Sequence, residues 1–464
     1  MTKKVLPIRL MSELKASIKL GSPLILTNLA QVALLTTNLI FIGRLGKTEL
    51  AAGSLAASLY HAFMIFSLGL VSATIPMLAT SLGKSRNNFA EIQKIIRHGF
   101  LTALIICLPF LVVLWNADKL LLTLGQNPDT VEIAIDYIHI MMWSLLPYLG
   151  YIVLRSLLAA LEKPMWTLLV AFGGFFINAF LGWLFIFGNW GMPALGIAGA
   201  GVAITLTNIL MFGSMLLLIH KHSSFNKYQI FNNFWQWSPA YLAEMWKLGL
   251  PIAVTFTLET LVFYAAVIMM GLIGDTSLAA HAIAMQISSV SYMIPLGFGQ
   301  VATIRVGLAM GRAQPKDAVQ AGWVSYGLGV GFMAIAAGVM LFNPEMLIAF
   351  FIDANAPENR AVIITSVQFL FFAALFQLAD GAQAVAAGML RGFYDTRTPM
   401  VLALIGYWLL GVPIGAFLAF GVGMEGVGIW IGFVTGLSVV AVLLTLRWWR
   451  HTQRLLKQPE FHYD

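Results

Sequence analysis

Long apolar stretches recur along the whole chain, and short polar or glycine-containing segments separate them. Each stretch is long enough to cross a bilayer core of roughly 30 Å, which takes about 20 helical residues. There are twelve of them, so the sequence predicts an all-α integral membrane protein with twelve transmembrane helices. Their approximate centres are Leu29, Phe66, Ile106, Ser144, Phe176, Leu206, Glu259, Tyr292, Val330, Ala374, Leu410 and Phe433.

Only one connector between these stretches is long. It is polar and aromatic, and it runs from His220 to Tyr241. Because an even number of spans precedes it, both halves of the chain enter the membrane from the same side. We therefore expect an N-terminal six-helix lobe at residues 1–220, a cytoplasmic connector at 221–241, and a C-terminal six-helix lobe with a cytoplasmic tail at 242–464.

Composition and charge agree with this layout. Apolar residues make up 59% of the chain and charged residues only 10%, so most of the surface faces lipid. Of the 27 lysines and arginines, all but four fall in the termini or the even-numbered connectors; the four are Arg44, Lys47, Lys119 and Arg360. Cytoplasmic loops carry the excess of positive charge, so both termini are predicted to be cytoplasmic.

Several classes of function are disfavoured. The net charge of +7 is scattered between apolar runs, which is not the basic face that nucleic acid requires. The single cysteine, Cys107, excludes a disulfide framework within the chain. The sequence has no phosphate-binding glycine-lysine loop, no zinc-type His-Glu pairing on a helix and no Gly-x-Ser-x-Gly elbow. We expect neither an enzyme nor a bound cofactor.

The two halves are related in sequence. Adding 228 to a position in the first half often gives a similar residue in the second. Lys19-Leu20-Gly21 with Pro23 matches Lys247-Leu248-Gly249 with Pro251, while Gly43, Gly46 and Thr48 match Gly271, Gly274 and Thr276. With a small change of offset, Leu154-Arg155 matches Leu390-Arg391. Six helices per copy give parallel repeats with a pseudo-twofold axis along the membrane normal, which is typical of transporters that work by alternating access.

Two acidic residues stand apart from the other eighteen of the 20, which lie in connectors, termini or helix ends. Glu259 lies twelve residues from both Lys247 and Gly271, or roughly 18 Å along a helix from either end. Asp380 lies eleven residues from Arg391, or about 16 Å. A carboxylate at such depth costs at least about 2.5 kcal/mol to insert, so it is expected to face a cavity, bind a cation or carry a proton. The alternative is a structural hydrogen bond between helices.

Helical spacing surrounds each acid with suitable groups. Phe256 and Phe263 flank Glu259 on one face of its helix, and Gln377 and Gln383 flank Asp380. Carboxylates, amides and aromatic rings are the groups that hold a cation, and carboxylate oxygens also suit Na⁺. The acids thus form a possible sodium site, and the same acids can carry protons. For a single phenylalanine, packing is the simpler alternative.

The first half differs at the matching positions. Gln31 stands where the second half has Glu259, since 259 − 228 = 31. Asn38 and Asn178 are further polar groups at depth, as candidates for a cavity or for hydrogen bonds between helices. We expect no lysine or arginine at membrane depth, which leaves the two acids without a basic counterpart.

The sequence resembles the multidrug and toxic compound extrusion family, specifically its NorM-type bacterial branch. The resemblance covers nearly the whole chain, and four ordered stretches carry it: Leu248-Gly-Leu-Pro-Ile252 before Glu259, Ala279-Ala-His-Ala-Ile283, Thr303-Ile-Arg-Val-Gly307, and Asp380-Gly-Ala-Gln-Ala-Val-Ala-Ala-Gly388 followed by Leu390-Arg391-Gly392. It implies two six-helix lobes in the inner membrane of a bacterium. Such a protein exports lipophilic organic cations in exchange for Na⁺ or H⁺. A monomer is expected.

The resemblance also assigns roles. It likens Glu259 and Asp380 to the cation-coupling acids of the family, and Tyr292 to an aromatic residue beside them. One position departs from the family, because Asn38 stands where many relatives have an aspartate. Proton chemistry in the first lobe is thereby placed in doubt. The alternatives left open are a lipid-linked oligosaccharide flippase of the same superfamily and a multi-pass membrane enzyme.

Overall fold

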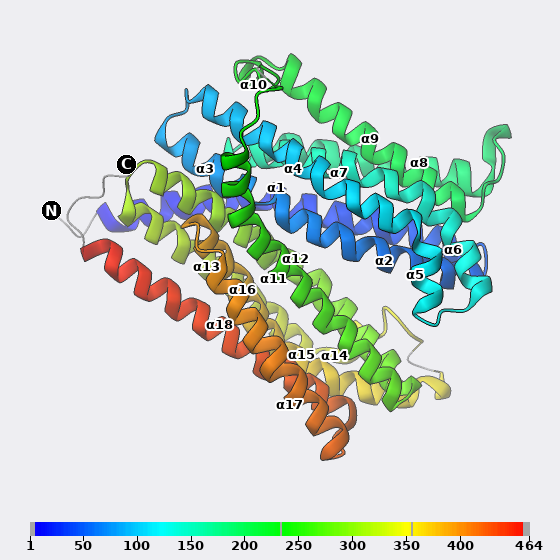
Figure 1. The fold of residues 1–464 in the computed structure, drawn as a ribbon. Helices are drawn as coiled ribbons and strands as arrows, with labels where there is room; N and C mark the ends of the chain where they lie inside the picture. The colour runs from blue at the N-terminus through cyan, green and yellow to red at the C-terminus, as the bar shows by residue number, and fades with distance from the viewer. Residues whose placement is uncertain (1–4, 233, 354–355, 458–464) are drawn as a thin grey trace. The chain divides into compact units, whose positions relative to one another are not determined.

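The computed structural model describes residues 5–232, 234–353 and 356–457. Within these ranges the chain is helical and contains no strand. Twelve helical segments are long and apolar enough to cross a membrane. The predicted all-α, twelve-helix membrane fold is therefore confirmed; Figure 1 labels its elements.

Six spans make up the first half. Two of them are broken into two helices each, where α2 is continued by α3 and α6 by α7. The helices of the spans are α1 (Val5–Gly43), α2 (Lys47–Val71), α3 (Thr74–Lys84), α4 (Phe89–Trp115), α6 (Pro128–Met141), α7 (Leu145–Ala160), α8 (Pro164–Phe187) and α9 (Ile197–Lys221). The short helices α5 (Ala117–Thr123) and α10 (Ser223–Asn226) lie between spans.

The α-helices of the second half are α11 (Pro239–Ile273), α12 (Asp275–Gly311), α13 (Pro315–Phe342), α14 (Pro344–Ile348), α15 (Arg360–Gly392), α16 (Arg397–Ala403), α17 (Val412–Ala416) and α18 (Glu425–Lys457). Two π-helical segments, Leu404–Gly411 and Phe417–Gly421, lie before and after α17 in the eleventh span. Proline at the first helical position begins several of these helices, because its missing N–H has no partner there in any case.

The turn between the first two spans has the same backbone shape in both halves. Gly46 has φ 159° and ψ 174°, and Gly274 has φ 148° and ψ 166°. These two glycines are partners in the repeat, since 46 + 228 = 274. The repeat read from the sequence is therefore also present in the conformation of the chain.

The helices form two compact units. The N-terminal unit is Leu26–Ala253, and the C-terminal unit is Met1–Ile25 with Val254–Asp464. The two boundaries again differ by 228, and each lies two residues after a proline inside a helix, Pro23 in α1 and Pro251 in α11. The first part of α1 thus belongs to the C-terminal unit, and the first part of α11 to the N-terminal unit. The lobe boundaries expected at residues 220 and 242 stay a prediction.

Close packing at matched glycines holds these exchanged segments. In the C-terminal unit, a Cβ on Gly21 would lie 3.0 Å from the Phe298 ring of α12. In the N-terminal unit, a Cβ on Gly249 would collide with the carbonyl oxygen of Leu70 in α2. Gly21 pairs with Gly249, and Leu70 with Phe298, at the same offset of 228. The two repeats therefore exchange equivalent segments through equivalent contacts.

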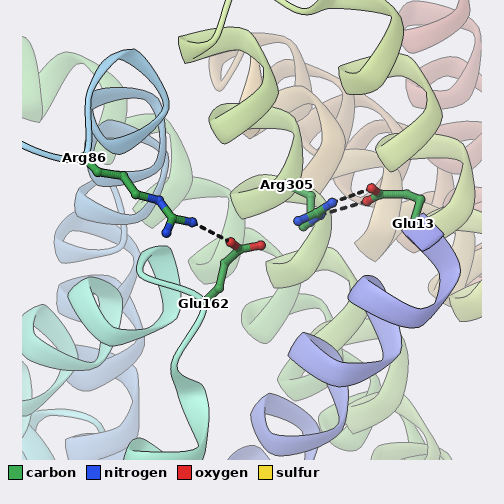
Figure 2. A network of polar contacts seen from close by, with 4 residues as sticks. All are labelled: Glu13, Arg86, Glu162 and Arg305. Carbon is green, nitrogen blue, oxygen red and sulfur yellow. Dashed lines mark hydrogen bonds and ion pairs between the residues drawn. The ribbon is translucent and has the colours of Figure 1, made fainter. Parts of the chain in front are cut away.

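Two ion pairs hold polar ends of helices in place, and Figure 2 shows both. In the C-terminal unit Arg305 of α12 binds Glu13 of α1 through two nitrogens, with Nε 2.8 Å from Oε1. In the N-terminal unit Arg86 lies 3.5 Å from Glu162, between the turns after α3 and after α7. A bidentate guanidinium–carboxylate contact fixes orientation better than a single hydrogen bond. The Arg305–Glu13 pair is therefore the more rigid of the two.

Candidate functional site: a carboxylate pocket in the C-terminal unit

A small pocket in the C-terminal unit contains the first of the predicted acids. Helices α11, α12, α15 and α18 and the eleventh span surround it. Its lining residues that carry polar groups or rings are Thr255, Phe256, Glu259, Tyr292, Gln383, Arg391 and Tyr407. Predicted residues from three separate spans, namely Phe256, Glu259, Tyr292 and Gln383, are thus brought together.

Glu259 is the acid that this pocket exposes. It is half-buried, and one of its carboxylate oxygens accepts a hydrogen bond of 3.3 Å from the Tyr292 hydroxyl. The indole N–H of Trp408 donates to the Leu258 carbonyl oxygen at 3.2 Å, which ties the π-helical segment of the eleventh span to α11 next to Glu259. The carboxylate is therefore positioned by two neighbouring spans and still reachable from the pocket.

A guanidinium lies in the same pocket. Arg391 of α15 stands over the Phe256 ring with its central carbon 4.9 Å from the ring centroid, and it interacts electrostatically with Glu259. The expectation that the acids have no basic counterpart is therefore wrong. Arg391 sits near the end of α15, where sequence reasoning placed it in a connector. From there its long side chain extends into the pocket, where the guanidinium lies over the Phe256 ring.

Asp380 is less exposed than Glu259. Its side chain is 4% exposed, and its neighbours on α15, Gln377 and Gln383, are 0% and 4% exposed. Among the described protein atoms, Asp380 Oδ1, Gln383 Oε1 and both amide atoms of Gln377 have no hydrogen-bond partner. Asp380 does not line the pocket itself, but it interacts electrostatically with Glu259 and Tyr292. Buried oxygens of this kind are ligands that a bare alkali cation accepts.

Phe263 packs instead with other rings. Its centroid lies 6.2 Å from that of Phe376 and 5.6 Å from that of Phe433, both at edge-to-face angles. It does not line the pocket. Aromatic packing, the simpler alternative for this residue, is therefore what the structure shows.

The predicted residues of the first half lie in the N-terminal unit, apart from this pocket. Gln31 and Asn28 of α1 accept hydrogen bonds from Arg155 of α7, at 3.3 Å and 2.6 Å. Asn178 of α8 donates to the Thr207 hydroxyl of α9 at 3.4 Å, and Asn38 is 3% exposed. Asn178 is thus a hydrogen-bond partner between helices, which was one of the two roles considered for it.

No group of three or more His, Cys, Asp and Glu side chains in the described ranges is arranged to hold a metal ion. A transition metal would need such a group. An alkali cation does not, because carboxylate, hydroxyl and amide oxygens suffice for it. Glu259, Tyr292 and Gln383 supply these oxygens around one pocket.

Comparisons with known proteins decide the family. Residues 23–184 and 251–417, more than half of the chain, match the MatE family. The chain belongs to this family. A probable multidrug resistance protein NorM of Brucella suis is 53% identical to this chain, over 95% of this chain and 93% of its own length. The protein of the same name from Mesorhizobium japonicum is 48% identical over 94% of each chain.

A solved MATE structure in the bent conformation has the same fold, with a TM-score of 0.86 over 98% of this MatE chain and 99% of its own. At 17% sequence identity this likeness shows a shared fold and nothing further. Proteins of the MatE family are transporters and not enzymes, so the alternative of a membrane enzyme is excluded. The resemblance to this family is confirmed.

Sequence reasoning missed four residues of these sites. Thr255, Arg391 and Tyr407 line the pocket, and Arg155 holds Gln31. A signal for the arginines was present, because Leu-Arg recurs in matching places of the two halves. No sequence pattern pointed to Tyr407, which enters the pocket from the π-helical part of its span.

Proposed function

We propose that this protein exports lipophilic organic cations in exchange for Na⁺ or H⁺, with Glu259 and Asp380 as the coupling acids. The observation that carries the proposal is the pocket in which a reachable carboxylate, Glu259, lies beside an aromatic ring, Phe256, that already holds a cationic group. The relatives from Brucella suis and Mesorhizobium japonicum are probable multidrug resistance proteins, which supports export of varied compounds.

Exchange follows from competition for the same acids. If the organic cation and the coupling ion both need the carboxylates, binding of one lowers the affinity for the other, and this effect is reciprocal at equilibrium. An ion entering down its gradient then displaces the cargo, and the cargo displaces the ion on the other side. Glu259 lines the pocket, where cargo can reach it, and we propose that the coupling ion uses both Glu259 and the buried Asp380, so that the two guests compete at Glu259.

The orientation in the membrane is part of the proposal. Positive charge gathers in the termini and even-numbered connectors, which supports cytoplasmic termini, and the bacterial relatives support an inner-membrane location. We expect a monomer, since each chain contains a whole pocket. Cysteines at positions 47 and 360 should react with an impermeant reagent from outside, and at 86 and 312 only after permeabilisation. Labelling of position 312 from outside contradicts this topology.

The test of function is transport by the purified protein in liposomes. We expect uptake of a fluorescent lipophilic cation into vesicles when either a Na⁺ gradient alone or a proton gradient alone is imposed, and no uptake without a gradient. Uptake that ignores both gradients contradicts the proposal. Preferential transport of organic phosphates supports the flippase alternative instead.

A further inference from the structure

The face of α11 that presents Glu259 also presents Phe256, three residues earlier and on the same side of the helix. An aromatic face and a carboxylate one helical turn apart form a receptor for an organic cation. In the structure this receptor is in contact with the guanidinium of Arg391, 4.9 Å from the Phe256 centroid and in electrostatic interaction with Glu259. The chain's own side chain is thus placed where a cationic guest would bind.

We propose that Arg391 is a built-in competitor, whose guanidinium holds the Phe256–Glu259 receptor and is displaced by an incoming organic cation. This inference rests on the proposed function, because it concerns the cargo site of the same pocket. It assigns to Arg391 the role of setting the affinity for cargo and promoting its release.

The physical reason is that two cations cannot share one ring and one carboxylate. A guanidinium over a ring is attracted by the negative face of the ring, and an unpaired carboxylate in an apolar site is costly. When no cargo is bound, Arg391 partly balances the charge of Glu259. Cargo binding therefore gains only the difference between the interaction free energy of the organic cation and that of the Arg391 guanidinium. Affinity is weaker than the receptor alone would give, and an exporter that must release its cargo needs this limit.

The first half supplies a matched reference. Arg155 donates to Asn28 and Gln31, which occupy the repeat positions of Phe256 and Glu259, since 28 + 228 = 256 and 31 + 228 = 259. The same three places therefore meet in both repeats, but the N-terminal copy offers uncharged amides in place of a ring and a carboxylate. A cationic guest that displaced Arg155 would find no carboxylate to bind there. Arg155 is then a structural tie and not a competitor.

The experiment is equilibrium binding of tetraphenylphosphonium, a lipophilic cation, to the purified full-length protein. We expect Arg391→Gln to bind it about tenfold more tightly than wild type, which corresponds to about 1.4 kcal/mol, with slower dissociation. Arg391→Lys keeps the charge without the planar group and should bind about threefold more tightly. The matched control, Arg155→Gln, should not change the affinity.

A second substitution identifies the source of the gain. In the Glu259→Gln background, Arg391→Gln should no longer improve binding, because no carboxylate remains to be contested; the two substitutions are non-additive. Unchanged or weaker binding in Arg391→Gln and Arg391→Lys overturns the proposal, as does an equal gain in Arg155→Gln. Size-exclusion profiles confirm folding, and Arg391→Lys decides alone if Arg391→Gln aggregates. The proposed function fails separately, when no ion gradient drives transport by the wild type.

Discussion

The two repeats carry related clusters that differ in charge. In the N-terminal unit Arg155 is hydrogen-bonded to the amide oxygens of Asn28 and Gln31. In the C-terminal unit Arg391 lies over the Phe256 ring and faces the Glu259 carboxylate. In the first cluster these two partners of the arginine are neutral amides. The second contains an acid that an outside cation can contest.

This difference supports the proposal that only one of the two related clusters takes part in ion chemistry. An arginine held by amides has no acid whose charge state could change with an ion gradient. An arginine beside a reachable carboxylate has such an acid as its neighbour. We therefore propose that ion coupling resides in the C-terminal unit and that the N-terminal cluster stabilises the fold.

The largest effect is expected on export when the acids of the C-terminal unit are neutralised. Glu259→Gln and Asp380→Asn keep the shape of the side chains but remove the charge, so each should reduce gradient-driven dye export at least tenfold. Asn38→Ala, at the position where relatives have aspartate, should retain most of the activity. Export by the three variants in liposomes measures this. Full activity of both acid variants, with loss in Asn38→Ala, would place coupling in the N-terminal unit.

A smaller effect, on stability, is expected in the N-terminal unit. Arg155→Leu removes the donor to the amide oxygens of Asn28, which is buried, and Gln31, which is part-buried, at a cost of about 1 to 3 kcal/mol for the buried acceptor. The melting temperature in detergent should therefore fall by several degrees. Arg391→Leu, which is not held by such bonds to amides, serves as the comparison and should lower the melting temperature less. A greater loss in Arg391→Leu contradicts the structural role of Arg155.

A modest effect is expected at Tyr292. Tyr292→Phe removes the hydroxyl that donates to Glu259 at 3.3 Å, a long hydrogen bond to a charged group and worth about 1 kcal/mol. Export should fall by roughly two- to fivefold, with the dependence on the ion gradient preserved. An effect as large as that of Glu259→Gln would show that the hydroxyl is itself an essential ligand.

The smallest effect is expected from Gln31→Glu. This change puts the acid of the C-terminal repeat into the N-terminal cluster, where its carboxylate still accepts a hydrogen bond from Arg155. Because Arg155 pairs with the new acid, export should stay within about twofold of wild type, since a buried ion pair adds little net energy. The measurement is export with the number of coupling ions per dye. A change in the number of coupling ions per dye would show that the N-terminal cluster can be converted into a coupling site.

Much of the fold could be read from the sequence. Twelve apolar stretches and the repeat at 228 predicted the spans, because lipid requires each crossing segment to be a long apolar helix. The exchange of the first parts of α1 and α11 was not predictable, since the matched glycines at 21 and 249 do not reveal which helix they contact.

The site was predicted in part. Phe256, Glu259, Tyr292 and Gln383 do meet around one pocket, because depth and helical spacing restrict where such residues lie. Phe263 went to aromatic packing, which the same spacing allows equally well. The arginines were missed because depth was judged from the Cα position, while a long side chain places its charge more than one turn away.

The most direct test of the central claim is competition between ion and cargo on the purified protein. Affinity for tetraphenylphosphonium is measured as Na⁺ is raised at fixed pH, and then as pH is lowered without Na⁺. We predict that at least one ion weakens binding in wild type and in Asn38→Ala, and that neither does so once Glu259→Gln and Asp380→Asn are combined. Competition that persists in the double variant and disappears in Asn38→Ala would contradict the account.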